Sequence, residues 1–281
     1  MIEYIILAIL QGFFEWLPIS SSGQVMIVSM NLFGISIEEA FSLTIWMHLG
    51  TTLAVVFKFR TDFVKIFKSL MPTTYKVEEI DVRKRNWLAY ATLGTGITAL
   101  PLYFIFRVII SGAFVPIQGD LITLIISGLL IITGIILLKT RKIYGKNTID
   151  SIPQDSIPKD SFLSGFIQGV SILPGISRSG VTVSAILLEK YDQDNALRLS
   201  FLMSVPVAIA SIIVDIIFAE GSILGTLNLF EILLALVITF VVGYLTIEFL
   251  LRLAQKISFG YFCILYGVLA FLIIIPFMVI P

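Results

Sequence analysis

The chain has 281 residues, of which 57% are hydrophobic and only 14% are charged, and its mean hydropathy is +1.00. Soluble domains carry about 25% charged residues, so this composition excludes an ordinary soluble domain and indicates an all-α integral membrane protein. The formal net charge is zero, the lone Cys263 excludes a disulfide framework within the chain, and the single His48 excludes a histidine-rich metal site.

The first predicted element is a broken apolar stretch. Residues 2–17 and 21–33 are apolar, but the sequence LPISSSG interrupts them. Neither piece is long enough to span alone, since a helix needs about 20 apolar residues to cross the hydrocarbon core. Irregular backbone at membrane depth is tolerated only inside protein or beside a watery cavity. We therefore predict a re-entrant hairpin of two half-helices.

Six full spans and a second hairpin complete the prediction. The second broken stretch, residues 162–173 and 178–190, is interrupted at LPGISRSG. Polar connections are expected at 60–86 and 142–160. The predicted spans are 39–59, 87–106, 121–141, 196–218, 229–254 and 260–280.

The two halves of the chain resemble each other. The matching dipeptides are Gln11-Gly12 with Gln168-Gly169, Leu17-Pro18 with Leu173-Pro174, and Ser22-Gly23 with Ser179-Gly180. Each half holds one hairpin and three spans, so the second half enters the membrane in the opposite orientation. The sequence therefore predicts one membrane domain, residues 1–281, built from inverted repeats of about residues 1–145 and 161–281, whose broken helices meet near the midplane.

The basic residues support this arrangement. If the first hairpin enters from the outside, all but two of the 19 lysine and arginine residues fall at the opposite face, the exceptions being Arg107 and Arg178. Cytoplasmic loops of membrane proteins carry an excess of Lys and Arg. We therefore expect a multi-pass protein of the cell membrane with both termini outside and the basic loops 60–86 and 142–160 in the cytoplasm.

Polar residues gather at the first hairpin. Gln11 and Glu15 lie four positions apart, which puts both on one face of the first half-helix. A carboxylate at membrane depth is costly and is therefore a functional candidate; the alternative is that Glu15 only ties two helices together by a hydrogen bond. Ser20, Ser21 and Ser22 then open the second half-helix, whose free amides and hydroxyls form a cradle suited to phosphate.

The second hairpin adds an arginine. The sequence SRSG, residues 177–180, starts a half-helix in the same way. A buried guanidinium needs a partner, and either Glu15 or a phosphate would serve, the bidentate phosphate contact being the stronger use. Because the inverted repeat brings the two tips together, we expect Glu15, Ser21 and Arg178 to line one pocket with the groups that phosphoryl transfer needs.

These motifs resemble those of the undecaprenyl-diphosphatase (undecaprenyl pyrophosphate phosphatase) family, which is also associated with bacitracin resistance. Gln11 and Glu15 match the family's Glu/Gln-x-x-x-Glu. Residues 17–23 match its Leu-Pro-x-Ser-Ser-x-Gly, and residues 174–180 match its Pro-Gly-x-Ser-Arg-Ser-Gly. The segments HLGTTLAVVFKFR and LSFLMSVP are also similar to family sequence, so the resemblance covers nearly the whole chain.

The resemblance implies an activity and roles for named residues. The family removes the terminal phosphate from a polyprenyl diphosphate, giving the monophosphate carrier lipid, at an active site open to the outer face. It implies Glu15 as the essential carboxylate, Ser21 as the candidate nucleophile and Arg178 as the phosphate clamp. It also implies Mg²⁺ or Ca²⁺, for which Glu15 is the candidate ligand. The residues expected to bind the substrate are Gln11, Ser20, Ser22, Gly23, Gln24, Gln168, Gly175, Ser177, Ser179 and Gly180. The expected partners are this lipid and the bilayer, with no nucleic acid, and a homodimer is a further expectation.

One position departs from the family pattern. Gln24 stands where the family's histidine is expected. Glutamine hydrogen-bonds a phosphate but does not accept a proton near neutral pH. A general base contributes about 10²–10⁴-fold, so the departure predicts slower hydrolysis organised around Glu15. A second hypothesis is therefore a transporter or flippase for polyprenyl phosphate, because transporters also place broken helices around an anion-binding site.

Other polar residues are expected to be structural. His48 is predicted to make a helix-packing hydrogen bond rather than take part in catalysis. Arg198 is expected to reach the cytoplasmic interface. Asp215 and Glu220 are expected to be solvated near the outer end of a span, and contact with a cation is the alternative. Ser36 with Glu39 predicts a capping box at the start of the first full span.

Overall fold

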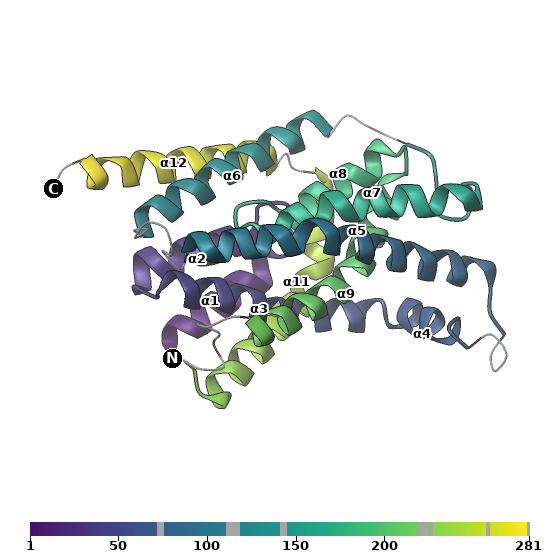
Figure 1. The fold of residues 1–281 in the computed structure, drawn as a ribbon, viewed down its shortest axis with the longest axis horizontal. Helices are drawn as coiled ribbons and strands as arrows, with labels where there is room; N and C mark the ends of the chain where they lie inside the picture. Colours follow the sequence, from purple (N-terminus) through teal and green to yellow (C-terminus); the bar gives the residue numbers. More distant parts are fainter. Residues whose placement is uncertain are drawn as a thin grey trace.

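The computed structural model of the chain describes residues 1–71, 76–110, 119–140, 145–218, 223, 227–256 and 259–279, and Figure 1 shows its fold. Within these residues the regular structure is helical, and β pairing is limited to one isolated bridge between Asn147 and Tyr191. The all-α prediction is therefore confirmed.

The helices fall into two series along the chain. The first series is α1 (Ile2–Phe14), α2 (Ser21–Phe33), α3 (Ile37–Lys58), α4 (Arg60–Lys68), α5 (Glu79–Ile110) and α6 (Gly119–Thr140). The second is α7 (Ile157–Gly169), α8 (Arg178–Leu188), α9 (Gln193–Phe218), α11 (Leu229–Lys256) and α12 (Phe259–Val279). Short 3-10 turns, Gln154–Ser156 and Val170–Ile172, lie on either side of α7.

Five helices within the described residues, α3, α5, α6, α9 and α11, are long and apolar enough to cross a membrane. Each overlaps a predicted span. Helix α5 begins at Glu79 rather than at residue 87, because its charged first turns extend the helix beyond the apolar segment. The sixth predicted span corresponds to α12, for which only the shorter apolar stretch Gly260–Leu272 is described in full. The chain is a multi-pass integral membrane protein.

The two interrupted apolar stretches form pairs of short helices. Helices α1, α2 and α7 have 13 residues each and α8 has 11. At about 1.5 Å per residue such helices are roughly 20 Å long or less, whereas the hydrocarbon core is about 30 Å thick. Helix α1 ends at Phe14, earlier than the predicted residue 17, and Glu15 forms its C-cap. Pro18 has no amide hydrogen to continue the helix.

One short helix of each series packs on a long helix of the other series. Helix α1 packs on α11, and α7 packs on α5. A Cβ added to Gly12 would lie 2.9 Å from the carbonyl oxygen of Thr239 on α11, and a Cβ added to Gly169 would lie 2.7 Å from that of Thr95 on α5. Glycine therefore lets both helix pairs approach closely at the matching Gln-Gly positions.

Helix α3 is the most enclosed of the candidate spans. Within its most apolar stretch, 67% is buried inside the protein, whereas the corresponding share is 28% in α5 and in α11. It packs on α1, α2, α9 and α11. Its N-terminus is capped by Ser36, whose hydroxyl accepts from the amide of Glu39, as the sequence predicts. Polar side chains in the middle of α3 therefore face protein.

Candidate active site

The connection between α1 and α2 (residues 15–20) touches the connection between α7 and α8 (residues 170–177). We call these two connections, together with the first turn of the helix after each, the tips. The hydroxyl oxygen of Ser20 accepts a hydrogen bond from the amide of Gly175 at 3.0 Å. A Cβ on Gly23 would lie 2.8 Å from the nitrogen of Gly175, so the two backbones are in direct contact. Gly175 has φ +102°, a conformation that a residue with a Cβ rarely adopts. The glycines of both motifs thus join the two tips.

Serine caps the helix that follows each tip. Ser20 caps α2 and accepts from the amide of Gly23, while Ser177 caps α8 and accepts from the amide of Gly180. The first amides of a helix have no partner within the helix and carry partial positive charge. The contact between Ser20 and Gly175 therefore brings two helix N-termini, both suited to bind anions, to one place.

Glu15 receives hydrogen bonds from both tips. Its side chain is 3% exposed. The amide of Gln11 and the hydroxyl of Ser21 each donate to its Oε2 at 2.7 Å. The guanidinium of Arg178, from the second pair, donates to its Oε1. The structure thus brings Glu15, Ser21 and Arg178 together.

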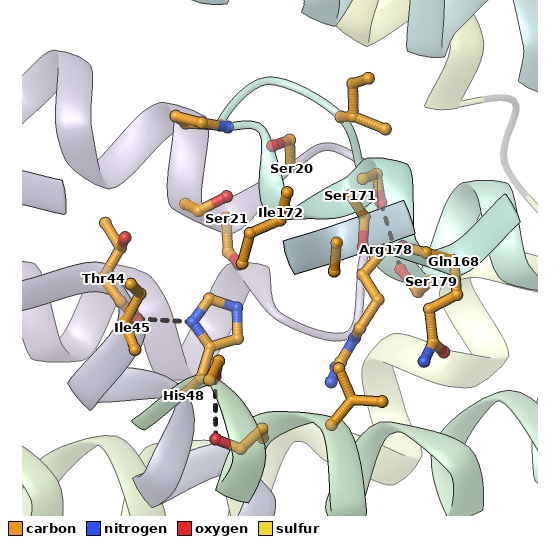
Figure 2. Close-up of a pocket in the computed structure, with 18 of the residues that line it drawn as sticks. Ser20, Ser21, Thr44, Ile45, His48, Gln168, Ser171, Ile172, Arg178 and Ser179 are labelled. Atoms are coloured by element: carbon orange, nitrogen blue, oxygen red, sulfur yellow. Dashed lines mark hydrogen bonds between the residues drawn. The ribbon is translucent and has the colours of Figure 1, made fainter. Parts of the chain in front are cut away.

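Sequence reasoning missed one residue of this group, His48. Its Nε2 lies 3.3 Å from Oε2 of Glu15, and its Nδ1 lies 2.5 Å from the carbonyl oxygen of Thr44. Figure 2 shows His48, Ser21 and Arg178 around the same space, each coming from a different helix. The bond to Thr44 lies within α3 and does not join two helices, whereas Nε2 of the ring faces the carboxylate of Glu15. The available signal was the chain's single histidine inside a predicted span.

These side chains line a cavity of about 80 Å³. A water needs about 10–15 Å³ of such volume, so the cavity has room for several waters or a small polar group. The predicted site residues that line it are Glu15, Ser20, Ser21, Ser22, Gln168, Ser177, Arg178 and Ser179. Those outside its lining are Gln11, Gly23, Gln24, Gly175 and Gly180. Gln11 nevertheless reaches the site through Glu15, and Gly23 and Gly175 form the contact between the tips.

Gln24 and Gln168 are held differently. The Nε2 of Gln24 donates to the carbonyl oxygen of Ile19 at 3.0 Å, which stabilises the turn before α2. Gln168 donates to the hydroxyl of Thr95 at 3.2 Å and accepts from that of Thr182 at 3.3 Å, at the wall of the cavity. Of the two glutamines, therefore, only Gln168 is placed to meet a ligand.

The donor set argues against a resident divalent cation. Within the described residues no group of three or more His, Cys, Asp or Glu side chains is placed to hold a metal ion. Glu15 is the only carboxylate among the residues that line the cavity, and both of its oxygens already accept hydrogen bonds. Ca²⁺ takes six to eight oxygen ligands, and Mg²⁺ held by one or two carboxylates relies on substrate phosphates for further ligands. The protein side chains alone therefore do not fit a resident ion.

One expectation for a charged residue outside the cavity is wrong, and Glu220 lies outside the described residues. Asp215 is fully buried rather than solvated, because Arg107 pairs with it at 2.9 Å and Ser42 and Trp46 donate to it. The side chain of Arg198 is 49% exposed, and its guanidinium pairs at 2.6 Å with Asp62 of the connection 60–86. Both pairs join helices distant in the sequence.

Comparison with known proteins agrees with the motifs. The family model described as bacitracin resistance protein BacA matches residues 4–272. A Methanococcoides burtonii protein named undecaprenyl-diphosphatase is 40% identical over 275 residues, covering 96% of this chain and 97% of that protein. Proteins of the same name from Methanothrix thermoacetophila and Haloarcula marismortui are 35% and 33% identical, covering 95% and 94% of this chain and 94% and 93% of their own lengths. The predicted family is thus confirmed, and the chain belongs to the bacitracin resistance protein BacA family.

Proposed function

We propose that the protein is a membrane phosphatase that removes the terminal phosphate from a polyprenyl diphosphate of the undecaprenyl type, leaving the monophosphate carrier lipid. The observation that carries this proposal is the hydrogen-bonded group of Glu15, Ser21 and Arg178, whose side chains line one cavity. The relatives reported above, each named undecaprenyl-diphosphatase, support the same reaction.

The site supplies a nucleophile and a base in contact. The hydroxyl of Ser21 donates to Glu15 at 2.7 Å, so the carboxylate is placed to take its proton as the oxygen attacks the terminal phosphorus. The leaving group is the lipid monophosphate, itself a stable anion. Water then hydrolyses the phosphoserine.

Arg178 and the helix N-termini hold the phosphate charge. A guanidinium binds phosphate oxygens in a bidentate manner, and the first amides of α2 and α8 are oriented toward an anion. In the structure Arg178 pairs with Glu15. A bound diphosphate offers Arg178 a second anion, which frees Glu15 to act as a base. Neutralising charge and positioning the phosphate are the main requirements of phosphoryl transfer.

The architecture belongs to the same proposal. Residues 1–281 form one membrane domain with six spans and two re-entrant hairpins, α1–α2 and α7–α8, arranged as inverted repeats of about residues 1–145 and 161–281. Matching hydrogen bonds support the repeat: the hydroxyl of Thr239 donates to the carbonyl of Ala8, and that of Thr95 donates to the carbonyl of Gly165.

The orientation in the membrane follows from charge. Figure 1 shows α4 and the starts of α5 and α7 at one end of the molecule, and the start of α1 at the other. The basic loops 60–86 and 142–160 belong to the first end, which we assign to the cytoplasm by the positive-inside rule. Both termini are then outside, and the cavity opens toward the outer face. A homodimer, and a Mg²⁺ or Ca²⁺ that reaches Glu15 with the substrate, remain predictions.

A phosphate-release assay tests the function. The purified protein should release phosphate from polyprenyl diphosphates in detergent, and Glu15→Ala or Arg178→Ala should abolish this release. In liposomes loaded on one side, release should occur without transfer of lipid phosphate across the bilayer. Transfer without release would instead support the transporter hypothesis. Full activity in either variant would exclude the proposed site.

A further inference from the structure

The single histidine of the chain contacts the candidate base. Its Nδ1 lies 2.5 Å from the carbonyl oxygen of Thr44, which only accepts hydrogen bonds, so Nδ1 carries a hydrogen. Its Nε2 lies 3.3 Å from Oε2 of Glu15, and an ionised carboxylate also only accepts. That second contact is favourable only when Nε2 carries a hydrogen as well. The geometry therefore fits a doubly protonated, cationic imidazole.

Two charged side chains of the described cavity face this ring. Glu15 comes from the end of α1, and Arg178 comes from α8. Helices α3, α5 and α9 line the rest of this part of the cavity with uncharged side chains, which are Phe41, Thr44 and Ile45, Thr95 and Ala99, and Val207, Ala208 and Ser211. The imidazole and the guanidinium thus share one carboxylate and lie beside the space proposed for the diphosphate.

We propose that His48 is a catalytic acid and base of this phosphatase, a role that rests on the function proposed above. In the first step the Ser21 oxygen bonds to the terminal phosphorus and its proton passes to Glu15. The bond from phosphorus to the bridging oxygen breaks, and Nε2 of His48 gives its proton to that oxygen. The enzyme then holds a phosphoserine, a neutral carboxyl and a neutral imidazole.

The second step restores every group. A water oxygen bonds to the phosphoserine phosphorus, and a proton of that water passes to Nε2 of His48. The bond between phosphorus and the Ser21 oxygen breaks, and the carboxyl of Glu15 returns its proton to that oxygen. One water is consumed, and the products are the lipid monophosphate and inorganic phosphate.

His48 also resolves the difficulty raised by position 24. Gln24 cannot carry a proton near neutral pH, and its amide bonds to Ile19 outside the cavity lining. His48 reaches the same hairpin from α3. The site therefore contains an imidazole, from His48, although position 24 after the first motif holds glutamine instead of the expected histidine.

The first test is the pH dependence of phosphate release by the native protein, His48→Gln and His48→Asn. Both variants keep a side-chain donor but cannot transfer a proton. We expect about a 10²-fold loss of kcat at the pH where the native protein is most active, the lower end for a general acid. The fall of kcat at alkaline pH, which we call the alkaline limb, should be missing in both variants. The difference in kcat between the native protein and each variant should therefore shrink as the pH rises. Lys58→Gln, at the far end of α3, should keep the native profile.

The second test observes the ring directly. Because His48 is the only histidine, ¹⁵N-histidine labelling gives NMR signals from this side chain alone. Both ring nitrogens should be protonated over the active pH range, and Nε2 should lose its proton at the pH of the alkaline limb. In Glu15→Gln the Nε2 resonance should change, because the carboxylate that faces it is gone. This measurement uses the native fold and does not depend on activity of the His48 variants.

The outcomes separate the two proposals. An alkaline limb that persists undiminished in His48→Gln, or a ring with only Nδ1 protonated throughout the active range, would overturn the role of His48. Absence of phosphate release by the native protein from every polyprenyl diphosphate would refute the phosphatase function itself, whatever the NMR result.

Discussion

Glu15 and Arg178 are separated by 163 positions in the chain, yet their side chains form an ion pair within the membrane domain. Only 3% of the Glu15 side chain and 16% of the Arg178 side chain are exposed. A buried ion pair persists when further hydrogen bonds satisfy its atoms, and here Gln11 and Ser21 provide them. Neither tip carries both charges, so the site exists only when the two tips pack together.

The pair should show coupled effects on stability and activity. Removing one member of a buried pair costs about 3–5 kcal/mol, so Glu15→Gln and Arg178→Gln should each lower the unfolding temperature in detergent. Each should reduce phosphate release by at least about 10²–10³-fold, the loss typical of one stabilising donor. The loss of stability in the double variant should be smaller than the sum of the two single losses. Strictly additive losses in the double variant would argue against the pair.

The contact between the tips should tolerate no side chain. Gly23→Ala puts a Cβ 2.8 Å from the nitrogen of Gly175, and Gly175→Ala forces alanine into φ +102°. Both variants should lose phosphate release and unfold at lower temperature, because the tips must separate. Gly96→Ala is the matched control: open space surrounds this glycine in α5, and alanine favours the helix by about 0.8–1.0 kcal/mol. A functional Gly23→Ala protein would contradict the packing.

Placing a histidine at position 24 should not accelerate the reaction. Gln24 is buried, donates to the carbonyl oxygen of Ile19 and lies outside the cavity lining, so Gln24→His removes a bond of the turn without bringing a ring to the phosphate. We expect kcat to stay level or fall, measured by phosphate release from a panel of polyprenyl diphosphates. A tenfold or larger gain would show that position 24, rather than His48, is where the site needs an imidazole.

The ion pairs of Asp62 should make stability depend on pH. Burial alone would raise the pKa of the Asp62 carboxyl, but the hydrogen bonds and charges of Lys84 and Arg198 outweigh burial and hold the pKa below its usual value. This stabilisation is complete above the unfolded pKa of about 3.9 and is lost as the pH falls through the folded pKa.

The unfolding temperature of the native protein should therefore fall as the pH drops below about 4. Asp62→Asn should be less stable at neutral pH and should lose less on acidification. Asp155→Asn, at an exposed position in the 3-10 turn before α7, should behave as the native protein does. An identical acid response in Asp62→Asn would show that these pairs contribute nothing to stability.

Local properties of the sequence determined much of this protein. Long apolar runs predict the spans because a helix in lipid must satisfy its own backbone, and Pro18 with the serines after it predicts the first break. Ser36 predicts the start of α3 because a cap acts over three residues. The motif residues Glu15, Ser21 and Arg178 were identified in the same way, because the hairpin spacing repeats along the chain.

Which polar groups share the site depends on long-range packing. The sequence predicts a structural role for His48 and substrate binding for Gln24, but His48 contacts Glu15 and Gln24 bonds to Ile19. These positions depend on how α3 packs against the first helix pair, which no local pattern encodes. Asp215 was expected in water because its partners Arg107, Ser42 and Trp46 are distant in sequence. Composition sets the membrane class and the helices, whereas the direction of each polar side chain depends on long-range packing.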